Sequence, residues 1–529
     1  MKRATLLILC LTMLLLRSIA QNKTIPGAIT SPYPTLINLA IEWIIEGDDN
    51  QNGRVTVQFR QKGEKLWQQG MPLFRVPKGK NEGFSWSNKH SGSIFDLKPD
   101  TEYEIWLKLI DPDGGSAEKK IVSRTRPEPQ ITKNAVIIEI KPGRYDTLQT
   151  KNGTPEKPMV YRCSKGEAVF SYIDLKNRKW VYIEELTVEN KKKEGIGIQL
   201  NGAENCVVRR CKINSVYGIV AYIPGATNCY ISDNSVTGTC VWTSEAMGCN
   251  GDNVGEGIEM TGPGNVICYN RVTGFRDCIS TMEDQHVVNQ TCIDIYNNDI
   301  FRGVDDAIEA DFCFSNCRIF RNRITNCYMG LSSQPGLGGP NYFVRNVMYN
   351  IINGGLKLQR YSQGDVILHN TMIKIGRGLG GNDPMDYAYF RNNLAIGGPV
   401  PVKKWGDYGV GKPYAADIEE PGVHSSFDYD AVGVYGTPYK AMIGKKSFAD
   451  VEDHGIEKIT IEGTFKNIDF PDPPAPEREV PDLRPKKSSR VIDGGVVIPN
   501  INDSYTGSAP DCGAYESGLE IPHYGPRKQ

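Results

Sequence analysis

The sequence predicts an all-β protein built around a β-solenoid, a stack of short strands. Three observations carry this prediction. An asparagine recurs in the frame Asn-any-apolar, at steps of 36, 28, 24, 24, 24 and 22 residues. Each period also contains a short alternating apolar segment and a glycine, which is typical of strands and turns. Units of this size bury their apolar face only by stacking on one another. The recurring residues are Asn234, Asn270, Asn298, Asn322, Asn346, Asn370 and Asn392.

Residues 1–20 are expected to be an export signal. Lys2 and Arg3 precede an apolar run, Leu6 to Leu16, that is too short to span a bilayer, and Ser18-Ile-Ala20 fits a cleavage site. No later apolar run approaches the length of a membrane span. We therefore expect a secreted or periplasmic protein without membrane insertion.

The charge balance argues against nucleic acid as a partner. The chain has 61 Lys and Arg against 62 Asp and Glu, for a formal net charge of -1. There is no basic excess to attract nucleic acid or an anionic membrane. We expect a monomer whose partner is a polysaccharide or oligosaccharide.

Cysteine usage favours a structural role. Thirteen of the 14 cysteines follow the signal, and an odd number cannot all pair internally. Cys206, Cys229 and Cys317 stand at Asn-Cys steps, where they are expected to stack in the core. Cys240 and Cys249 flank the 36-residue step, which leaves open a disulfide in that insertion.

The pattern of residues 25–127 differs from that of the solenoid and predicts a separate domain. Alternating strands are expected at 39–43, 55–60 and 103–107, and Leu97 to Tyr103 forms a tyrosine-corner pattern typical of an immunoglobulin-like β-sandwich. The segment resembles the fibronectin type III domain. The resemblance implies a spacer or docking module at the N-terminal side of the solenoid.

The solenoid is expected over 135–397, with an irregular cap over 398–529. The cap region loses the period and is rich in Gly, Pro and Tyr. We expect it to pack on the solenoid and blunt its open end. The insertion at the 36-residue step, around 243–255, is expected to shape a cleft.

One strand in each rung aligns with the next, which places side chains in columns. Because side chains alternate between the faces of a strand, the third position of each strand is expected to face outward. That column is Gln199, Val220, Glu259, Ser280, Glu309, Ser332 and Lys357, and the next outward positions include Asp311 and Gln359.

A carboxylate precedes the strand on three successive rungs. These residues are Glu256, Asp277 and Asp306, and Asp305 doubles the third. Like charges this close cannot all ionise freely, so at least one pKa is expected to rise. A protonated acid beside an ionised base is what glycoside hydrolysis needs.

This pattern resembles the right-handed parallel β-helix superfamily of pectin-active and related enzymes, nearest to the polygalacturonase-like glycoside hydrolases. Those enzymes carry one Asp on one rung and a paired Asp-Asp on the next, as in Asp277-Cys-Ile and Asp305-Asp306-Ala-Ile. The resemblance implies an inverting hydrolase of a plant or algal polysaccharide that needs no cofactor. It also implies that Asp306 is the general acid and that Asp277 and Asp305 position water.

The chain departs from that family on two rungs. The Gly-His-Gly rung of the family is Met329-Gly330 here, and its Arg-Ile-Lys rung is Lys357-Leu-Gln359. We therefore expect a related glycosidase with another substrate. The residues expected to bind that substrate are Glu256, Glu259, Glu309, Asp311, Lys357, Gln359, Arg360, Arg276 and Arg302.

Two other functions stay open. Glu259, Glu309 and Asp311 could hold Ca²⁺ while Lys357 or Arg360 abstracts a proton next to a uronate carboxylate, giving a polysaccharide lyase. A β-helix face also suits glycan binding without chemistry. Aromatic residues near the columns that could stack on sugar rings are Tyr222, Trp242, Phe275 and Tyr361.

Overall fold

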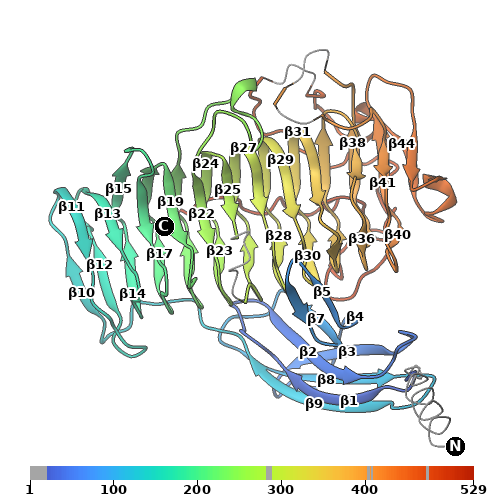
Figure 1. Ribbon diagram of the computed structural model, residues 1–529, viewed down its shortest axis with the longest axis horizontal. Helices are drawn as coiled ribbons and strands as arrows, with labels where there is room; N and C mark the ends of the chain where they lie inside the picture. The colour runs from blue at the N-terminus through green and yellow to red at the C-terminus, as the bar shows by residue number, and fades with distance from the viewer. Residues whose placement is uncertain (1–20, 282–288, 402–404, 407–408, 472–475, 529) are drawn as a thin grey trace, which may run out of the picture.

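A computed structural model describes residues 21–281, 289–401, 405–406, 409–471 and 476–528. The expected export signal lies outside these ranges. Two long parallel sheets form a solenoid, and an antiparallel unit precedes it (Figure 1). The predicted fold class is therefore confirmed. Within the described ranges, no helix has the length and hydropathy that crossing a bilayer requires.

The N-terminal strands form an antiparallel unit, called here the N-terminal sandwich, in the order β1-β2-β7-β4-β3-β8-β9. Trp43 is fully buried in its core, and Tyr103 Oη accepts a hydrogen bond of 2.9 Å from the Lys98 N–H at the expected corner. Assignment to the fibronectin type III class stays a prediction. The strands are β1 Ile25–Thr30, β2 Leu39–Glu46, β3 Arg54–Gln61, β4 Gln68–Val76, β5 Gly79–Asn81, β6 Phe84–Trp86, β7 Lys89–Ile94, β8 Glu102–Ile110 and β9 Ala117–Arg124.

The solenoid has a twelve-stranded and a seventeen-stranded parallel sheet. The twelve strands are β10 Val136–Glu139, β12 Met159–Arg162, β14 Val181–Glu184, β17 Val207–Arg209, β20 Tyr230–Ser232, β23 Val266–Cys268, β26 Asp294–Tyr296, β28 Arg318–Phe320, β30 Asn341–Val344, β33 Asp365–Leu368, β37 Tyr389–Arg391 and β40 Ser426–Asp428. Apolar side chains from both sheets fill the core between them.

The seventeen-stranded sheet carries the columns of interest. Its strands are β11 Gly143–Gln149, β13 Ala168–Asp174, β15 Thr187–Asn190, β16 Ile196–Gln199, β18 Lys212–Ser215, β19 Tyr217–Ala221, β21 Ser235–Thr237, β22 Glu256–Met260, β24 Arg271–Phe275, β25 Asp277–Ser280, β27 Asp299–Glu309, β29 Arg323–Ser333, β31 Val347–Leu358, β34 Thr371–Lys374, β38 Leu394–Gly397, β41 Ala431–Val434 and β44 Ile456–Ile459. Shorter elements are β32 Ser362–Gln363, β35 Leu379–Gly381, β36 Met385–Asp386, β39 Ala416–Ile418, β42 Ala441–Ile443, β43 Lys446–Ser447, the 3-10 helices η1 Ser244–Ala246 and η2 Phe448–Asp450, and helix α2 Ile461–Thr464.

The recurring asparagines form a continuous buried ladder. In each step the amide of one Asn donates to Oδ1 of the next, at 2.9 to 3.0 Å from Asn234 to Asn370. The same Oδ1 also accepts the backbone N–H of the preceding Asn. Every amide is therefore satisfied along the stack, which is what a buried polar column requires.

The prediction for the last member of the ladder is wrong by one residue. Asn370 donates to Asn393 Oδ1 at 3.0 Å, whereas the Asn392 amide contacts His369 Nε2 at 2.9 Å. The residue before each ladder Asn occupies the left-handed region, and Asn392 takes that position with φ 62°. Asn tolerates this conformation well, so the Asn-Asn pair divides into a corner residue and a ladder residue.

The stack of strands continues beyond residue 397, the end expected for the solenoid from the sequence. Strand β38 pairs with β41, and β41 with β44. Asn393 donates to Asp430 Oδ1 at 2.8 Å, and the Asp430 N–H donates to Glu452 at 2.9 Å. Carboxylates replace amides in these rungs, so the asparagine pattern does not reveal them.

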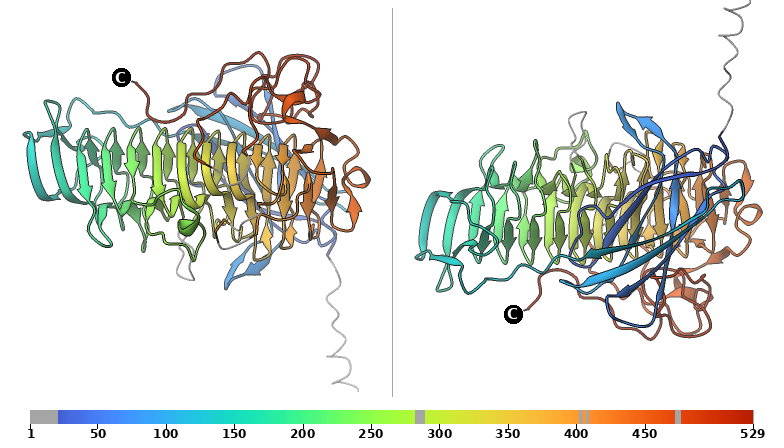
Figure 2. Two further views of the ribbon diagram at one scale, coloured as in Figure 1. Left: turned by 90° about the horizontal axis from the view of Figure 1, so that it is seen from above. Right: turned by 90° about the horizontal axis from the view of Figure 1, so that it is seen from below.

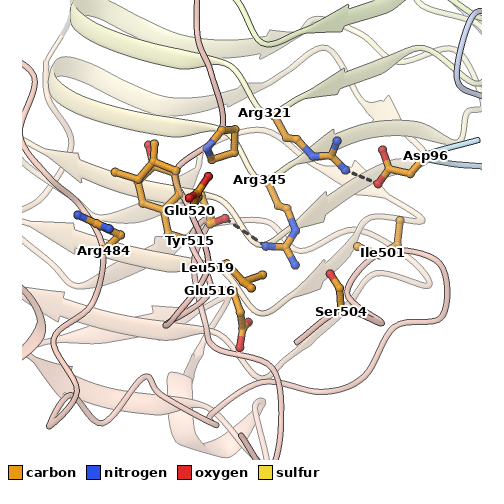
Figure 3. Close-up of a pocket in the computed structure, with 13 residues that line it drawn as sticks. Asp96, Arg321, Arg345, Arg484, Ile501, Ser504, Tyr515, Glu516, Leu519 and Glu520 are labelled. Atoms are coloured by element: carbon orange, nitrogen blue, oxygen red, sulfur yellow. Dashed lines mark hydrogen bonds and ion pairs between the residues drawn. The ribbon is translucent and has the colours of Figure 1, made fainter. Parts of the chain in front are cut away.

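The final residues run back along the side of the solenoid (Figure 2). Asn297 donates to His523 O at 2.8 Å, and Arg527 pairs with Asp233 at 2.6 Å. A cavity of about 180 Å³ lies where this segment meets the solenoid and the sandwich. Arg321 and Asp96 form an ion pair beside it (Figure 3).

The N-terminal sandwich packs directly on the solenoid. Arg318 is fully buried and pairs with Asp294 at 2.5 Å. From the sandwich, Asn38 donates to the same carboxylate at 2.8 Å, and Ser93 Oγ accepts from Arg318 at 3.1 Å. A buried charge pair shared across the contact holds the two parts in one arrangement.

The described ranges contain no disulfide. The one between Cys240 and Cys249 that the sequence leaves open is therefore not formed there. Cys206, Cys229 and Cys317 are buried in the stack as expected.

Replacing a ladder residue tests its structural role. We expect Asn322→Ala to lower the free energy of unfolding by about 2–4 kcal/mol, because it removes the bonds to Ile295 O and Asn346 and leaves buried partners unsatisfied. The measurement is the denaturant midpoint. Asn467→Ala, at an exposed position, is the control. Equal midpoints for both variants would contradict the role assigned to the ladder.

Candidate active site

Strand register brings the predicted carboxylates together. Glu256 pairs with Asp277 between β22 and β25. The Asp306 N–H donates to Asp277 Oδ1 at 2.7 Å, which places Asp306 on the next rung of the same column. Adjacent rungs of a parallel sheet lie about 4.8 Å apart. Acids that are far apart in the sequence therefore become neighbours.

The predicted outward column also has the expected register. Glu259 pairs with Ser280, Ser280 with Glu309, Glu309 with Ser332, and Ser332 with Lys357. The column lies beside the corner acids, so the Lys357 side chain can reach back across two rungs to Asp306.

A bulge turns Asp305 toward a different environment from Asp306. Between β27 and β29 the register shifts after Gly303, so that Val304 and Asp305 stand opposite Tyr328 alone. Bulges re-aim side chains and are common next to active sites. The doubled aspartate of the sequence is this extra residue.

A cleft of about 870 Å³ lies along these columns. Of the acids, Asp305 and Glu309 line it, together with the basic residues Arg276, Lys357 and Arg360. Gln359 lines it too. Its remaining lining includes Cys249 from the insertion and residues between 377 and 419: Arg377, Asn382, Asp383, Gly409, Gly411, Lys412 and Glu419.

The acids are far less exposed than a solvent-facing column would be. Asp277, Asp306 and Asp311 are buried, and Glu259 and Glu309 nearly so. The expectation that the third position faces open solvent is therefore wrong in this part of the stack. Neighbouring side chains shield one another, and the insertion packs close by, with Met247 and Tyr328 in one apolar cluster together with Val410 from the C-terminal region.

Two cations balance the cluster. Lys357 Nζ lies 2.8 Å from Asp306 Oδ2 and 4.0 Å from Glu309. Arg276 Nε lies 3.5 Å from one oxygen each of Asp277 and Asp305. Four acids therefore share these two cations, so the cluster carries excess negative charge when it is fully ionised.

Two further acids are held by local donors. Ser280 donates to Glu256 at 2.9 Å. Asp311 Oδ1 accepts from Ser332 Oγ at 2.6 Å and from the Gln334 N–H at 2.8 Å. These contacts hold both acids in place at the ends of the cluster.

Burial and mutual repulsion raise the pKa values in this cluster. Burial, with the charges of Asp277 and Asp306, raises the pKa of Asp305 to about 8. Burial, followed by the Glu259 charge, raises the pKa of Glu256 to about 8. The pKa values of Asp277 and Glu309 also rise well above the usual range, with burial as the main cause. The cluster therefore retains protons at neutral pH.

Lys357 responds in the opposite direction. Burial lowers its pKa, but the carboxylates of Asp306, Asp311 and Glu309 outweigh burial, and the resulting pKa is above the usual lysine range. Lys357 is thus a cation as long as these acids carry negative charge.

Three of the acids also fit a cation. One oxygen each of Asp277, Asp306 and Glu309 lies within 4.8 Å of the others. Asp306 Oδ1 is buried and has no hydrogen-bond partner among the described residues. Hard cations prefer such oxygen ligands. This set shares Glu309 with the Glu259, Glu309 and Asp311 expected from the sequence, but Asp277 and Asp306 take the place of the other two.

Some predicted residues lie elsewhere. Arg302 pairs with Glu477 at 2.6 Å, so the structure does not bring it to the cleft. Phe275 is buried in the core and Trp242 packs in the insertion cluster. Sequence reasoning missed Arg377 and Asn382, which stand outside the aligned strand columns, and Lys412, which follows the loss of the repeat.

The fold and this site define a parallel β-solenoid protein with a carboxylate cluster on the wall of a cleft. A solved structure of a Yersinia enterocolitica family 28 exopolygalacturonase is similar to the chain, with 13% identity over 83% of this chain and 99% of that chain and a TM-score of 0.29. A likeness at this level carries no inference about activity. No family model and no curated protein matches the chain.

The raised pKa values predict how stability depends on pH. Between the unfolded pKa of Asp, about 3.9, and the folded pKa of Asp305, about 8, the folded state keeps a proton that the unfolded state releases. Stability therefore falls as pH rises through this window.

We expect the unfolding temperature of the wild type to fall from pH 5 to pH 8 by about 3 °C more than that of Asp305→Asn, which mimics the protonated acid. Thermal denaturation measures both, with Asp146→Asn at an exposed site as the control. Parallel pH profiles for wild type and Asp305→Asn would contradict the assignment.

Proposed function

We propose that the protein is a glycoside hydrolase that cleaves an acidic polysaccharide in this cleft. The observation that carries the proposal is the placement of two carboxyls on the cleft wall, Asp305 with its pKa raised to about 8 and Glu309, above a buried layer of acids. An acid that keeps its proton at neutral pH, on the same cleft wall as a second carboxyl, suits glycosidic bond cleavage.

The geometry favours Asp305 over Asp306 as general acid. Asp306 is fully buried, does not line the cleft and accepts a hydrogen bond from Lys357. Asp305 donates its proton to the glycosidic oxygen as the C–O bond breaks, and Glu309 takes a proton from the water that attacks the anomeric carbon.

The buried acids tune this pair. Burial is the main cause that raises the pKa of Glu309; a proton held on Asp277 removes one of the further causes, and the Lys357 cation at 4.0 Å lowers the pKa. Arg276 lies between Asp277 and Asp305, where it holds both side chains in place.

The cleft lining supports an acidic substrate. Five basic side chains line it, against the four carboxyls of Asp305, Glu309, Asp383 and Glu419; the basic residues are Arg276, Lys357, Arg360, Arg377 and Lys412. Arg binds carboxylates through paired hydrogen bonds, and lysine adds a point charge. We propose a uronate-containing polysaccharide, of plant or algal walls, as the substrate. Action outside the cytoplasm would follow from the export signal expected at residues 1–20.

Hydrolysis is tested with a panel of uronate and neutral polysaccharides. We expect new reducing ends without the ultraviolet absorbance of an unsaturated uronate. Asp305→Asn should lower kcat by about 10²- to 10⁴-fold, because it removes the general acid. The matched control is Glu189→Gln, whose side chain pairs with Arg144 elsewhere on the solenoid. Full activity of Asp305→Asn would contradict the proposal.

A second candidate is β-elimination by a polysaccharide lyase, favoured by the three oxygens within 4.8 Å of one another. Asp277, Asp306 and Glu309 would hold Ca²⁺, which when bound neutralises the acids and binds a uronate carboxylate. With these acids neutralised, the pKa of Lys357 falls and its amine can accept the substrate proton.

The same assay separates the candidates. Formation of ultraviolet-absorbing products, and its loss when EDTA is added to the reaction, would establish elimination and overturn hydrolysis. Saturable binding of a polysaccharide without any product would instead support the third function left open by the sequence, a non-catalytic glycan-binding protein.

A further inference from the structure

A hairpin of the N-terminal sandwich reaches the solenoid beside the cleft. Strands β5 (Gly79–Asn81) and β6 (Phe84–Trp86) pair with each other and stand apart from the other sandwich strands. Both views in Figure 2 show this hairpin and the insertion around 243–255 projecting on the same side of the solenoid. The sandwich therefore contributes to the surroundings of the candidate site.

Asn81 makes the contact. Its amide donates to Arg360 O at 2.8 Å and to Tyr361 O at 3.2 Å. Its Oδ1 accepts the Glu82 N–H at 3.0 Å, which fixes the orientation of the amide with its donors toward the solenoid. One side chain from the sandwich therefore binds two successive carbonyls at the rim of the cleft.

The two residues that Asn81 binds have an uncommon backbone conformation. Arg360 and Tyr361 both lie in the left-handed region, with φ of 53° and 57°. Residues with Cβ seldom adopt this region twice in succession, and surrounding contacts must hold them there. Asp383 provides a second hold, because its carboxylate accepts the Arg360 N–H at 3.0 Å.

The hairpin itself is anchored on the solenoid. The Phe84 ring packs edge-on against Phe312 at 5.9 Å and Phe314 at 5.4 Å between centroids. Trp86 packs over Gly338, where an added Cβ would meet the indole at 2.8 Å. The position of Asn81 is therefore set by packing rather than by a single hydrogen bond.

The held residues present groups that suit an acidic sugar. Arg360 lines the cleft, and within the described part of the chain its guanidinium makes no ion pair. Tyr361 exposes 62% of its surface, which is a large fraction for an aromatic side chain. A guanidinium binds a carboxylate through paired hydrogen bonds, and an aromatic face stacks on a sugar ring.

We propose that Arg360 and Tyr361 form a binding subsite for a uronic acid unit next to the reaction centre, and that Asn81 of the N-terminal sandwich positions it. This inference rests on the proposed function, because the subsite serves the polysaccharide that the cleft binds. It gives the sandwich a part in substrate specificity beyond that of a spacer.

The test measures binding and turnover separately. In the full-length Asp305→Asn protein, calorimetric titration with oligogalacturonate, oligomannuronate and neutral xylo-oligosaccharide gives affinities without cleavage. We expect Tyr361→Ala and Asn81→Ala each to weaken binding of the preferred uronate oligomer on the order of tenfold. Arg360→Gln should weaken uronate binding while leaving neutral oligomers unchanged. Ser85→Ala, on the same hairpin, is the matched control.

In the active protein, the same substitutions should raise KM and leave kcat within about twofold, since they remove uniform binding only. Asn81→Ala combined with Tyr361→Ala should cost less than the sum of the two single changes, because both act on one subsite. Unchanged affinity and KM in all three variants, with cleavage intact, would overturn the subsite alone. Absence of both binding and cleavage by the unsubstituted protein would overturn the proposed function as well.

Discussion

The buried asparagine ladder is the constraint on which the rest of the structure depends. Each ladder amide bonds to the rung before and the rung after, from Asn234 to Asn393, so the register of one rung determines that of the next. A slip of one residue would reverse every side chain of a strand between core and surface. The alignment of Asp277 with Asp306, which are distant in sequence, follows from this column.

That register brings like charges together at a position where their repulsion does not stabilise the fold. Burial and repulsion raise the pKa values of Asp305 and Glu256 to about 8, and the cations Arg276 and Lys357 oppose the repulsion. Sites that depart from the local rules of stability are often functional. The insertion and the C-terminal region enclose the acids and so create both the cleft and its electrostatics.

Periodicity in the sequence was sufficient for the fold class, for the columns and for the acids that share them, because strand alternation and rung spacing are simple geometry. It failed wherever a feature breaks the period. Asn393 rather than Asn392 joins the ladder because the left-handed corner takes the first residue of the pair, and Asp430 continues it without an asparagine. Arg377 and Lys412, and the hairpin contact of Asn81, arise from long-range packing that carries no local signal.

We propose that the carboxylate cluster on the cleft wall is the reaction centre for an acidic polysaccharide. A crystal structure of the Asp305→Asn protein with a bound uronate oligosaccharide would test this proposal. We expect a glycosidic oxygen within hydrogen-bonding distance of residue 305 and a sugar carboxylate against the basic side chains that line the cleft. An oligosaccharide bound on another face of the solenoid, with the cleft vacant, would contradict it.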